Sequence, residues 1–277
     1  MLIDTHAHLN FKAFKKNLDN VLWGAREEGV EEIIVPGTDL ETSRKAVELA
    51  RHYEIIFAAV GIHPHHCNAQ YQLSNVKTDL TKLAKNNKVV AIGECGLDYY
   101  HYEKTKYKDY KVDKEFKKKQ KELFQIQLEV AQELKLPVII HSREAHQDLQ
   151  KILKAKKYKN LNGVFHCFTA DKKFLKWALK KGFYIGFDGN ITYDQKLLAI
   201  VKATPLSRIL IETDAPLLLP EPLRSLKKFP NKPENIKIIA EYIARAKNKS
   251  FSQVAKKTTA NARKLFHFYN VRLHPQQ

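Results

Sequence analysis

Short, mostly apolar runs alternate with longer segments of helical spacing, and this alternation repeats eight times along the chain. The runs are continuously apolar rather than alternating, which is typical of strands buried on both faces of a parallel sheet. We predict strands at residues 2–5, 32–35, 55–61, 89–93, 138–141, 163–166, 184–187 and 209–211.

Helical spacing fills the segments between these strands. We predict helices at residues 20–29, 40–52, 73–85, 114–136, 144–157, 172–182 and 195–202, and two C-terminal helices at 233–247 and 250–270. Eight strands each followed by a helix favour a (β/α)₈ TIM barrel, with an open doubly wound sheet as the alternative. The length of 277 residues suits one such barrel, so we expect residues 1–277 to form a single domain.

Cysteine content and hydropathy indicate the compartment. The three cysteines are an odd number without a CxxC pair, so we expect no disulfide framework and a reducing environment. Asp4 and His6 interrupt the apolar start of the chain, so we expect no signal peptide. No apolar run approaches the roughly 20 residues of a spanning helix, so we expect a cytoplasmic protein without membrane association.

The chain is strongly basic, with 48 Lys and Arg against 30 Asp and Glu and a formal net charge of +18. A field of this sign attracts polyanions such as nucleic acid. Only nine of the basic residues are arginine, and an excess of lysine also serves general solubility. The charge therefore leaves both interpretations open.

Candidate metal ligands follow the first predicted strand. His6 and His8 are two residues apart, and side chains at that spacing on a strand point to the same side. Both imidazoles can therefore reach one metal ion. This motif alone is a modest signal, because two unrelated polar residues at a strand end have the same spacing.

Four more ligand-type residues follow other predicted strands. Glu94 follows the fourth strand, His141 ends the fifth, His166 ends the sixth and Asp214 follows the eighth. Catalytic residues of a TIM barrel come from the C-terminal ends of several strands, so all six side chains should converge. Ionisable groups are rarely buried without partners, which makes a chance arrangement improbable.

Four imidazoles and two carboxylates exceed the ligand set of one tetrahedral metal. Two divalent ions that share a carboxylate fit this set better. Mixed nitrogen and oxygen ligation suits Zn²⁺ or Mn²⁺ and is less selective for Mg²⁺, so the sequence leaves the metal open among Mg²⁺, Mn²⁺ and Zn²⁺.

Other polar residues near these strand ends are candidates for supporting roles. His63 and His65 close the third strand and are candidates to contact substrate, as is Arg143, which can hold a phosphate or carboxylate. Cys95 and Cys167 each adjoin a ligand in sequence, so strand alternation predicts that both pack outside the barrel.

Two loops that follow strands should lie on the catalytic face. Residues 101–121 contain nine lysines with interleaved aromatic residues, and residues 215–232 contain four prolines. The tyrosines of the first loop can stack unpaired bases while its lysines follow the backbone, although a solvated helix face with buried aromatics explains the same pattern.

Six segments together resemble the TatD family of metal-dependent deoxyribonucleases, in the order of that family and across nearly the whole chain. These segments are Asp4-Thr5-His6-Ala7-His8-Leu9, Gly61-Ile62-His63-Pro64-His65, Gly93-Glu94-Cys95-Gly96-Leu97-Asp98, His141-Ser142-Arg143, His166-Cys167-Phe168 and Glu212-Thr213-Asp214-Ala215-Pro216.

This resemblance implies an amidohydrolase-like barrel with a two-metal site. It implies one ion held by His6, His8, Glu94 and Asp214, and a second ion held by Glu94, His141 and His166. It also implies 3′–5′ exonuclease activity on DNA. The segment at residues 101–121 looks longer than usual for the family, and residues 224–231 match the family's basic stretch only loosely.

Our hypothesis is phosphodiester hydrolysis with Glu94 as the bridging ligand and Asp214 as the catalytic residue that orients or deprotonates water. Asp4, Asp98 and Glu212 are candidates to accept hydrogen bonds from the ligand imidazoles. DNA is then the expected partner, with no obligate protein partner. The oligomeric state, the direction of attack and the choice of DNA or RNA stay open.

Two alternatives remain. One is an amidohydrolase acting on another ester or amide, such as an aminoacyl ester, although many such barrels bridge their metals with a carboxylated lysine and Glu94 stands here instead. The other is a nucleic-acid-binding protein with a structural metal. Structural zinc sites are usually closed and rich in cysteine ligands, which argues against this alternative.

Overall fold

Eight parallel strands form one sheet in the computed structural model, which describes residues 1–67, 73–103 and 111–268. Each strand pairs with the next along the chain, in the order β1 to β8. The strands are β1 (Leu2–Asp4), β2 (Val30–Pro36), β3 (Ile56–Val60), β4 (Val89–Asp98), β5 (Val138–Arg143), β6 (Gly163–Phe165), β7 (Tyr184–Phe187) and β8 (Ile209–Ile211).

The segment after β1 closes this sheet against β8. The Thr5 amide donates to the Ile211 carbonyl at 3.2 Å, and Ala7 forms a parallel bridge with Ala215. The prediction of a (β/α)₈ barrel is therefore confirmed, and the open doubly wound sheet is wrong.

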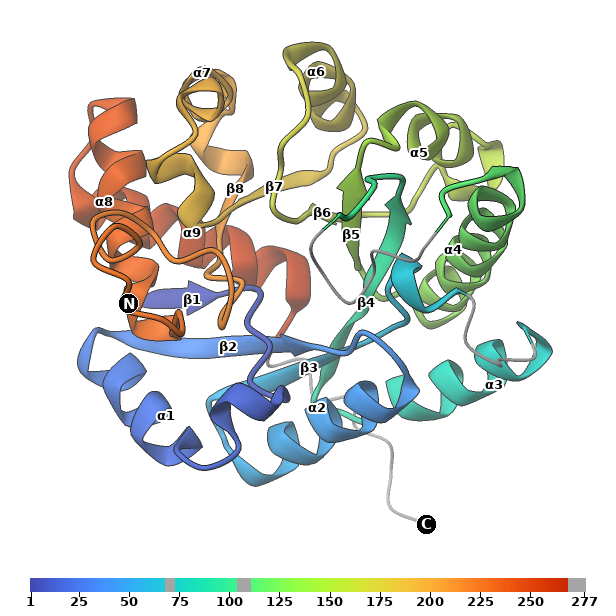
Figure 1. Cartoon of the computed structure of the whole chain (residues 1–277), viewed down its shortest axis with the longest axis horizontal. Coiled ribbons are helices and arrows are strands. Elements are labelled where there is room, and N and C mark those ends of the chain that lie inside the picture. Colours follow the sequence, from blue (N-terminus) through green and yellow to red (C-terminus); the bar gives the residue numbers. More distant parts are fainter. Residues whose placement is uncertain (68–72, 104–110, 269–277) are drawn as a thin grey trace.

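Helices surround the strands, as Figure 1 shows. They are α1 (Leu18–Glu27), α2 (Leu40–His52), α3 (Leu73–Ala84), α4 (Lys114–Leu134), α5 (His146–Leu153), α6 (Lys172–Lys180), α7 (Gln195–Ala203), α8 (Ile236–Lys247) and α9 (Phe251–Phe266). Side-chain caps begin several of them, because a capping oxygen satisfies an amide of the first turn. Asp39 and Thr42 form a reciprocal capping box at α2, and Asp113 accepts from the Phe116 amide at α4.

Several element boundaries differ from the sequence prediction, and three of them have a clear physical reason. β4 runs to Asp98 rather than ending at residue 93, so Glu94 lies within the strand and Asp98 ends it. α5 begins at His146 rather than at Glu144, because Glu144 has a φ of 54° and cannot start a right-handed helix. α9 ends at Phe266 because His267 has a φ of 49°.

The interior of the barrel is apolar at one end and polar at the other. Ile3, Ile34 and Phe57 form a buried cluster with residues of the other strands, and Leu265 and Phe266 of α9 complete it. α9 therefore closes the end at which the strands begin. The candidate ligands lie at the other end, where the strands finish, as in barrel enzymes generally.

Candidate metal centre

His6 and His8 follow β1 and point into the mouth of the barrel. Both are buried, and their Nε2 atoms lie 3.2 Å apart. Ala7, between them, is fully buried on the opposite side, so strand-like alternation persists beyond the end of β1. Asp214 approaches from the end of β8, with Oδ1 at 3.4 Å from His8 Nε2 and 3.5 Å from His6 Nε2.

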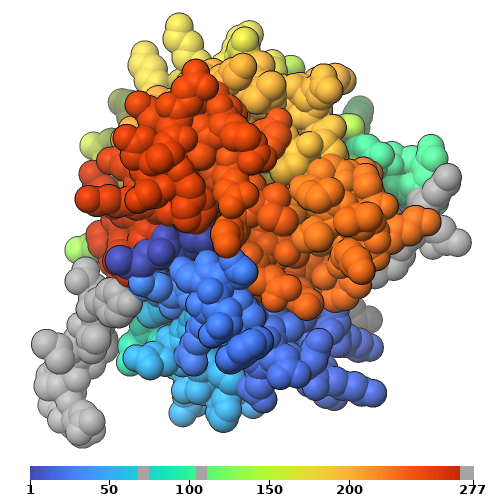
Figure 2. Space-filling model, turned by 90° about the vertical axis from the view of Figure 1, so that its left-hand side faces the viewer, coloured from blue at the N-terminus to red at the C-terminus, as the bar shows by residue number. Residues whose placement is uncertain are grey.

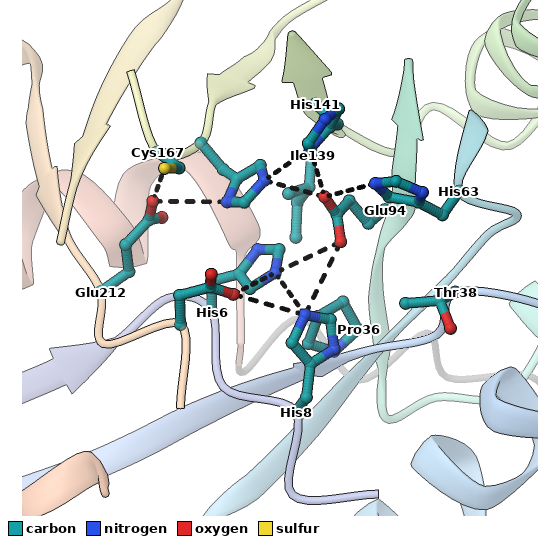
Figure 3. Close-up of polar contacts among 12 residues, drawn as sticks. His6, His8, Pro36, Thr38, His63, Glu94, Ile139, His141, Cys167 and Glu212 are labelled. Carbon is teal, nitrogen blue, oxygen red and sulfur yellow. Dashed lines mark hydrogen bonds and ion pairs between the residues drawn. The ribbon is translucent and has the colours of Figure 1, made fainter. Parts of the chain in front are cut away.

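Glu94 lies at the centre of the site, between two groups of imidazoles (Figure 3). Its Oε2 faces the first group, at 3.5 Å from His6 Nε2 and 3.7 Å from His8 Nε2. Its Oε1 faces the second, at 2.9 Å from His141 Nδ1 and 2.8 Å from His166 Nε2. Each carboxylate oxygen therefore serves one of the two groups.

Carboxylates behind the second group orient its imidazoles. Asp98 Oδ2 lies 3.0 Å from His141 Nε2, which leaves His141 Nδ1 directed at Glu94. Glu212 Oε1 lies 3.5 Å from His166 Nδ1 and accepts the backbone amide of Cys167. Asp98 and Glu212 thus lie where the sequence hypothesis placed them.

Among the described residues, Asp4 contacts backbone amides and a hydroxyl but no imidazole. Its Oδ1 accepts the backbone amides of His6 at 3.2 Å and Thr213 at 3.0 Å, and its Oδ2 accepts the Thr213 hydroxyl at 2.6 Å. The prediction that Asp4 supports a ligand imidazole is therefore wrong, because its side chain turns to the junction between β1 and β8. Burial raises the pKa of Asp4 to about 7.

The electrostatics of the centre fit a divalent cation. Burial alone would raise the pKa of Glu94, but His166, His63 and His141 hold it well below its usual range. Burial likewise disfavours charge on His141, yet bonds to Asp98 and Glu94 raise its pKa to about 9. The site thus concentrates positive charge around Glu94, and a divalent cation bound there would displace protons from the imidazoles.

Unpaired buried atoms support the same fit. Asp214 Oδ1 is buried without a hydrogen-bond partner among the described residues. Imidazole and carboxylate atoms form compact sets, with all members of each set within 4.8 Å of one another. The sets include His6, His8 and Asp214 on one side of Glu94, and Glu94, His141 and His166 on the other, and these two share no residue.

The three candidate substrate contacts differ in their placement. His63 is buried with Nε2 at 3.6 Å from Glu94 Oε1, and His65 is buried with Nε2 at 3.0 Å from Asp98 Oδ2. Arg143 is exposed at the rim, where its guanidinium lies 3.8 Å from the Tyr100 ring centroid. The Arg143 side chain is therefore accessible to solvent, whereas the His65 imidazole is paired with the Asp98 carboxylate.

Two residues at the site are not among the site residues expected from the sequence. The Tyr102 hydroxyl donates to Asp98 Oδ2 at 2.8 Å and accepts from Arg143 Nη1 at 3.0 Å, which links the rim to the centre. The buried Asp188 Oδ2 has no hydrogen-bond partner among the described atoms, and burial raises the pKa of Asp188 to about 8. The aromatic interleaving of residues 101–121 was the only signal for Tyr102.

The prediction for the two cysteines holds for one of them. Cys95 is buried in the apolar layer between the barrel and the helices. Cys167 instead lines the cavity, and its Sγ accepts a bond from Asn190 Nδ2 at 3.4 Å. Strand alternation failed there because β6 ends at Phe165 and Cys167 has a φ of 44°.

A cavity of about 1880 Å³ opens above the centre. Both loops singled out in the sequence contribute to it, through Tyr102 and Lys117 from the first and Leu217 from the second. Residues 114–121 of the first loop belong to α4, and residues 104–110 lie outside the described residues. Several basic side chains line the cavity, namely Lys12, Lys45, Lys117, Arg143 and Lys173.

A (β/α)₈ barrel with clustered histidines and carboxylates at its C-terminal mouth defines a metal-dependent barrel hydrolase. Residues 3–267 match the family described as TatD related DNase. The chain belongs to the TatD family and is a metal-dependent hydrolase.

Relatives and solved structures agree with this assignment. The uncharacterized metal-dependent hydrolase YabD of Bacillus subtilis is 39% identical over 268 residues, covering 96% of this chain and 99% of the relative. The 3′-5′ ssDNA/RNA exonuclease TatD of Erwinia tasmaniensis is 35% identical over 270 residues, covering 96% and 99%. The crystal structure of YJJV, a TatD homolog from Escherichia coli K12, has a TM-score of 0.84 at 29% identity, covering 96% and 98%.

None of the helices in the described part of the chain is both long and apolar enough to cross a membrane.

Proposed function

We propose that the chain is a 3′–5′ exonuclease that hydrolyses phosphodiester bonds of single-stranded DNA with two divalent metal ions. The position of Glu94 between two imidazole groups carries this proposal, because a carboxylate shared by two ions is typical of two-metal phosphodiesterase centres. The relative from Erwinia tasmaniensis that is named a 3′-5′ ssDNA/RNA exonuclease supports the polarity and the substrate. The formal net charge of +18 favours a polyanionic substrate.

In this proposal His6, His8 and Asp214 hold one ion, His141 and His166 hold the other, and Glu94 contributes one oxygen to each. When bound, divalent ions lower the pKa of water to about 7 and offset negative charge on phosphate oxygens. The identity of the ions is not fixed by these ligands, which suit Zn²⁺, Mn²⁺ or, with less selectivity, Mg²⁺.

Asp214 is the base that we propose for the reaction. Burial alone would raise its pKa, but the bond from His8 and the charge of His6 lower it below its ordinary value. The carboxylate is therefore ionised at neutral pH, and the oxygen that does not hold the ion can accept a proton from the attacking water.

The scissile phosphate contacts His63 and Arg143 in this proposal. His63 is kept neutral because burial holds its pKa well below the usual range, and its Nε2 faces the same side of Glu94 as His141. Arg143 carries a fixed positive charge at the cavity rim. Charge-assisted hydrogen bonds from these groups would offset charge that develops on the phosphate oxygens.

End-labelled oligonucleotides test the proposal. Single-stranded DNA labelled at the 5′ end is incubated with the full chain and Mg²⁺, Mn²⁺, Zn²⁺ or a chelator. We expect a ladder that shortens from the 3′ end only when metal is present. A 3′-labelled strand should release its label as a mononucleotide from the start. Intact DNA and RNA with every metal, together with cleavage of an aminoacyl ester, would favour the amidohydrolase alternative.

Replacing Arg143 with Ala should reduce kcat/KM for single-stranded DNA by roughly 10- to 100-fold, since a hydrogen bond to a charged group contributes about 1.5–3 kcal/mol. Tyr102→Phe keeps the ring beside Arg143 but removes the hydroxyl between Arg143 and Asp98, so we expect a smaller loss of about three- to tenfold. Steady-state kinetics with a fixed oligonucleotide measures both variants.

Tyr99→Phe is the matched control for this pair. Tyr99 also lines the cavity, but its hydroxyl donates to Asp148 at 3.0 Å rather than to Asp98 or Arg143. We expect its kcat/KM within about twofold of the wild type. Equal losses in the Tyr99 and Tyr102 variants would contradict a specific role for the Tyr102 hydroxyl.

A further inference from the structure

The loop between β8 and α8, residues 215–232, presents apolar and basic side chains together to solvent. Three of the seven exposed large apolar side chains in the described part of the chain belong to it, and they are Leu217, Leu226 and Phe229. Leu226 and Phe229 are each 60% exposed, and the exposed Lys227 and Lys228 lie between them in sequence. Figure 2 shows the orange part of the chain, which includes this loop, on the molecular surface.

Hydrogen bonds hold this loop in place at several points. The Asn231 side chain donates to the Thr213 carbonyl at 2.9 Å, and its backbone amide donates to the Pro216 carbonyl at 3.1 Å. The Glu221 amide donates to the Thr192 hydroxyl at 2.8 Å. The backbone that carries Leu226 and Phe229 is therefore held in place. A ligand that binds there would pay only a small entropy cost for ordering the loop.

The loop is continuous with the wall of the metal-site cavity. Leu217 and Tyr193 both line the cavity. The Arg224 guanidinium lies 4.3 Å from the centroid of the Tyr193 ring. The contact between Tyr193 and Arg224 thus joins the cavity wall to the stretch of the loop that carries Leu226 and Phe229 in sequence.

We propose that this surface binds the single-stranded nucleic acid beyond the nucleotides held in the cavity. Phe229 and Leu226 provide apolar contacts for bases, while Lys227 and Lys228 contact backbone phosphates. Sequence-tolerant binders of single strands combine exposed aromatics with a basic track in this way. The inference rests on the proposed nuclease function. It adds a binding surface for nucleotides that contribute to affinity but are not cleaved.

The positive charge of the loop favours single-stranded nucleic acid over an apolar protein surface as the ligand. Arg224, Lys227 and Lys228 place three positive charges within five residues of the loop. A second copy of the chain would bring the same charges against them, because a two-fold interface pairs a patch with itself. A polyanion with flat apolar bases matches both the charge and the exposed side chains.

Two double variants test the surface, with fluorescence anisotropy of a labelled 20-nucleotide strand in chelator so that no cleavage occurs. We expect Leu226→Ser/Phe229→Ser to weaken binding about tenfold. We expect Lys227→Gln/Lys228→Gln to lower the magnitude of the slope of log affinity against log salt by about 1.4, since each phosphate contact on a single strand contributes about 0.7. In steady-state assays with metal, KM should rise about tenfold for the long strand and stay unchanged for a dinucleotide.

Matched controls lie on α9, at the opposite end of the barrel. Phe251 is exposed at the start of α9, and Lys256 and Lys257 are an exposed lysine pair on the same helix. Phe251→Ser and Lys256→Gln/Lys257→Gln should leave oligonucleotide affinity and salt slope unchanged. Melting temperatures of all variants check that each one folds.

Several results would overturn the inference without touching the proposed function. Unchanged affinity in the loop variants, while the wild type still cleaves DNA, would remove the surface and leave the nuclease. A wild-type dimer that dissociates in Leu226→Ser/Phe229→Ser, with unchanged affinity for the strand, would assign the surface to a second copy. Conversely, if the loop variants weaken binding but the wild type cleaves no strand with any of the metals, the binding surface would be supported and the nuclease function contradicted.

Discussion

Replacing Glu94 with Gln is expected to reduce hydrolysis by more than about 100-fold. Substitutions of groups that only support a ligand typically cost 10- to 100-fold in metal affinity or activity, and Glu94 is proposed to bind both ions directly. The carboxylate of Glu94 presents one charged oxygen to the His6–His8 side and one to the His141–His166 side. An amide has a single, uncharged oxygen, so it cannot replace both ligand atoms.

The variant should also hold less metal. We expect elemental analysis after dialysis to find close to two ions per wild-type chain and fewer in Glu94→Gln. The kcat of the variant should recover only in part at high metal concentration, because the missing negative charge also leaves four imidazoles near one another with less compensation.

Glu144→Gln is the matched control for this substitution. Glu144 lines the same cavity but is exposed at its rim. Its metal content should equal that of the wild type and its activity should stay within about twofold, as is usual for surface substitutions. A Glu94 variant with two ions and wild-type activity would rule out the shared-carboxylate centre.

The barrel was predictable because its strands are buried on both faces and therefore read as apolar runs. The predicted boundaries of helices and strands were wrong where backbone conformation or side-chain pairing, rather than hydropathy, sets the end of the element. Glu144 looks like the start of a helix but has a φ of 54°. β4 was predicted to stop at residue 93, since hydropathy drops at Glu94, yet the strand continues because this carboxylate is paired with imidazoles inside the barrel.

The convergence of the candidate ligands was predictable for a related reason. Parallel strands of a barrel end at one mouth, so ligand-type residues at several strand ends must meet there. What the sequence could not provide was the direction of each side chain beyond a strand end. The carboxylate of Asp4 turns to the backbone of Thr213 at the junction between β1 and β8. Cys167 turns into the cavity because it lies beyond the end of β6, where strand alternation no longer applies.

The bond from Tyr102 to Asp98 depends on a loop conformation that no periodicity describes. Its partner Arg143 was found in the sequence only because it follows His141 by two residues. Contacts of this kind join segments that are distant in sequence, so residue type and spacing do not predict them. They surround the candidate ligands here.

Asp214→Asn is expected to reduce kcat by about 10²- to 10⁴-fold, the usual contribution of a general base. Asn keeps the size of the side chain and one oxygen near His6 and His8 but cannot accept a proton. The group formed by Glu94, His141 and His166 does not include Asp214, so this variant should keep metal there. Single-turnover rates and elemental analysis separate this effect from the metal loss expected of Glu94→Gln.

The pH dependence gives the second readout. The pKa of Asp214 is lowered by His8 and His6, so the wild-type base is ionised throughout the neutral range. In the variant, hydroxide from solvent replaces the base to an extent that grows with pH. The deficit of Asp214→Asn should therefore shrink as pH rises, whereas a defect in metal binding alone would not follow hydroxide concentration in this way.

Asp194→Asn is the control for the change of charge. Asp194 lines the same cavity, and its carboxylate caps α7 by accepting the Lys196 amide at 3.0 Å, a role that Asn fills equally well. We expect its kcat to stay within about twofold of the wild type at every pH. A deficit in Asp214→Asn that is constant with pH and accompanied by loss of one ion would assign Asp214 to metal binding alone and leave the base to another group.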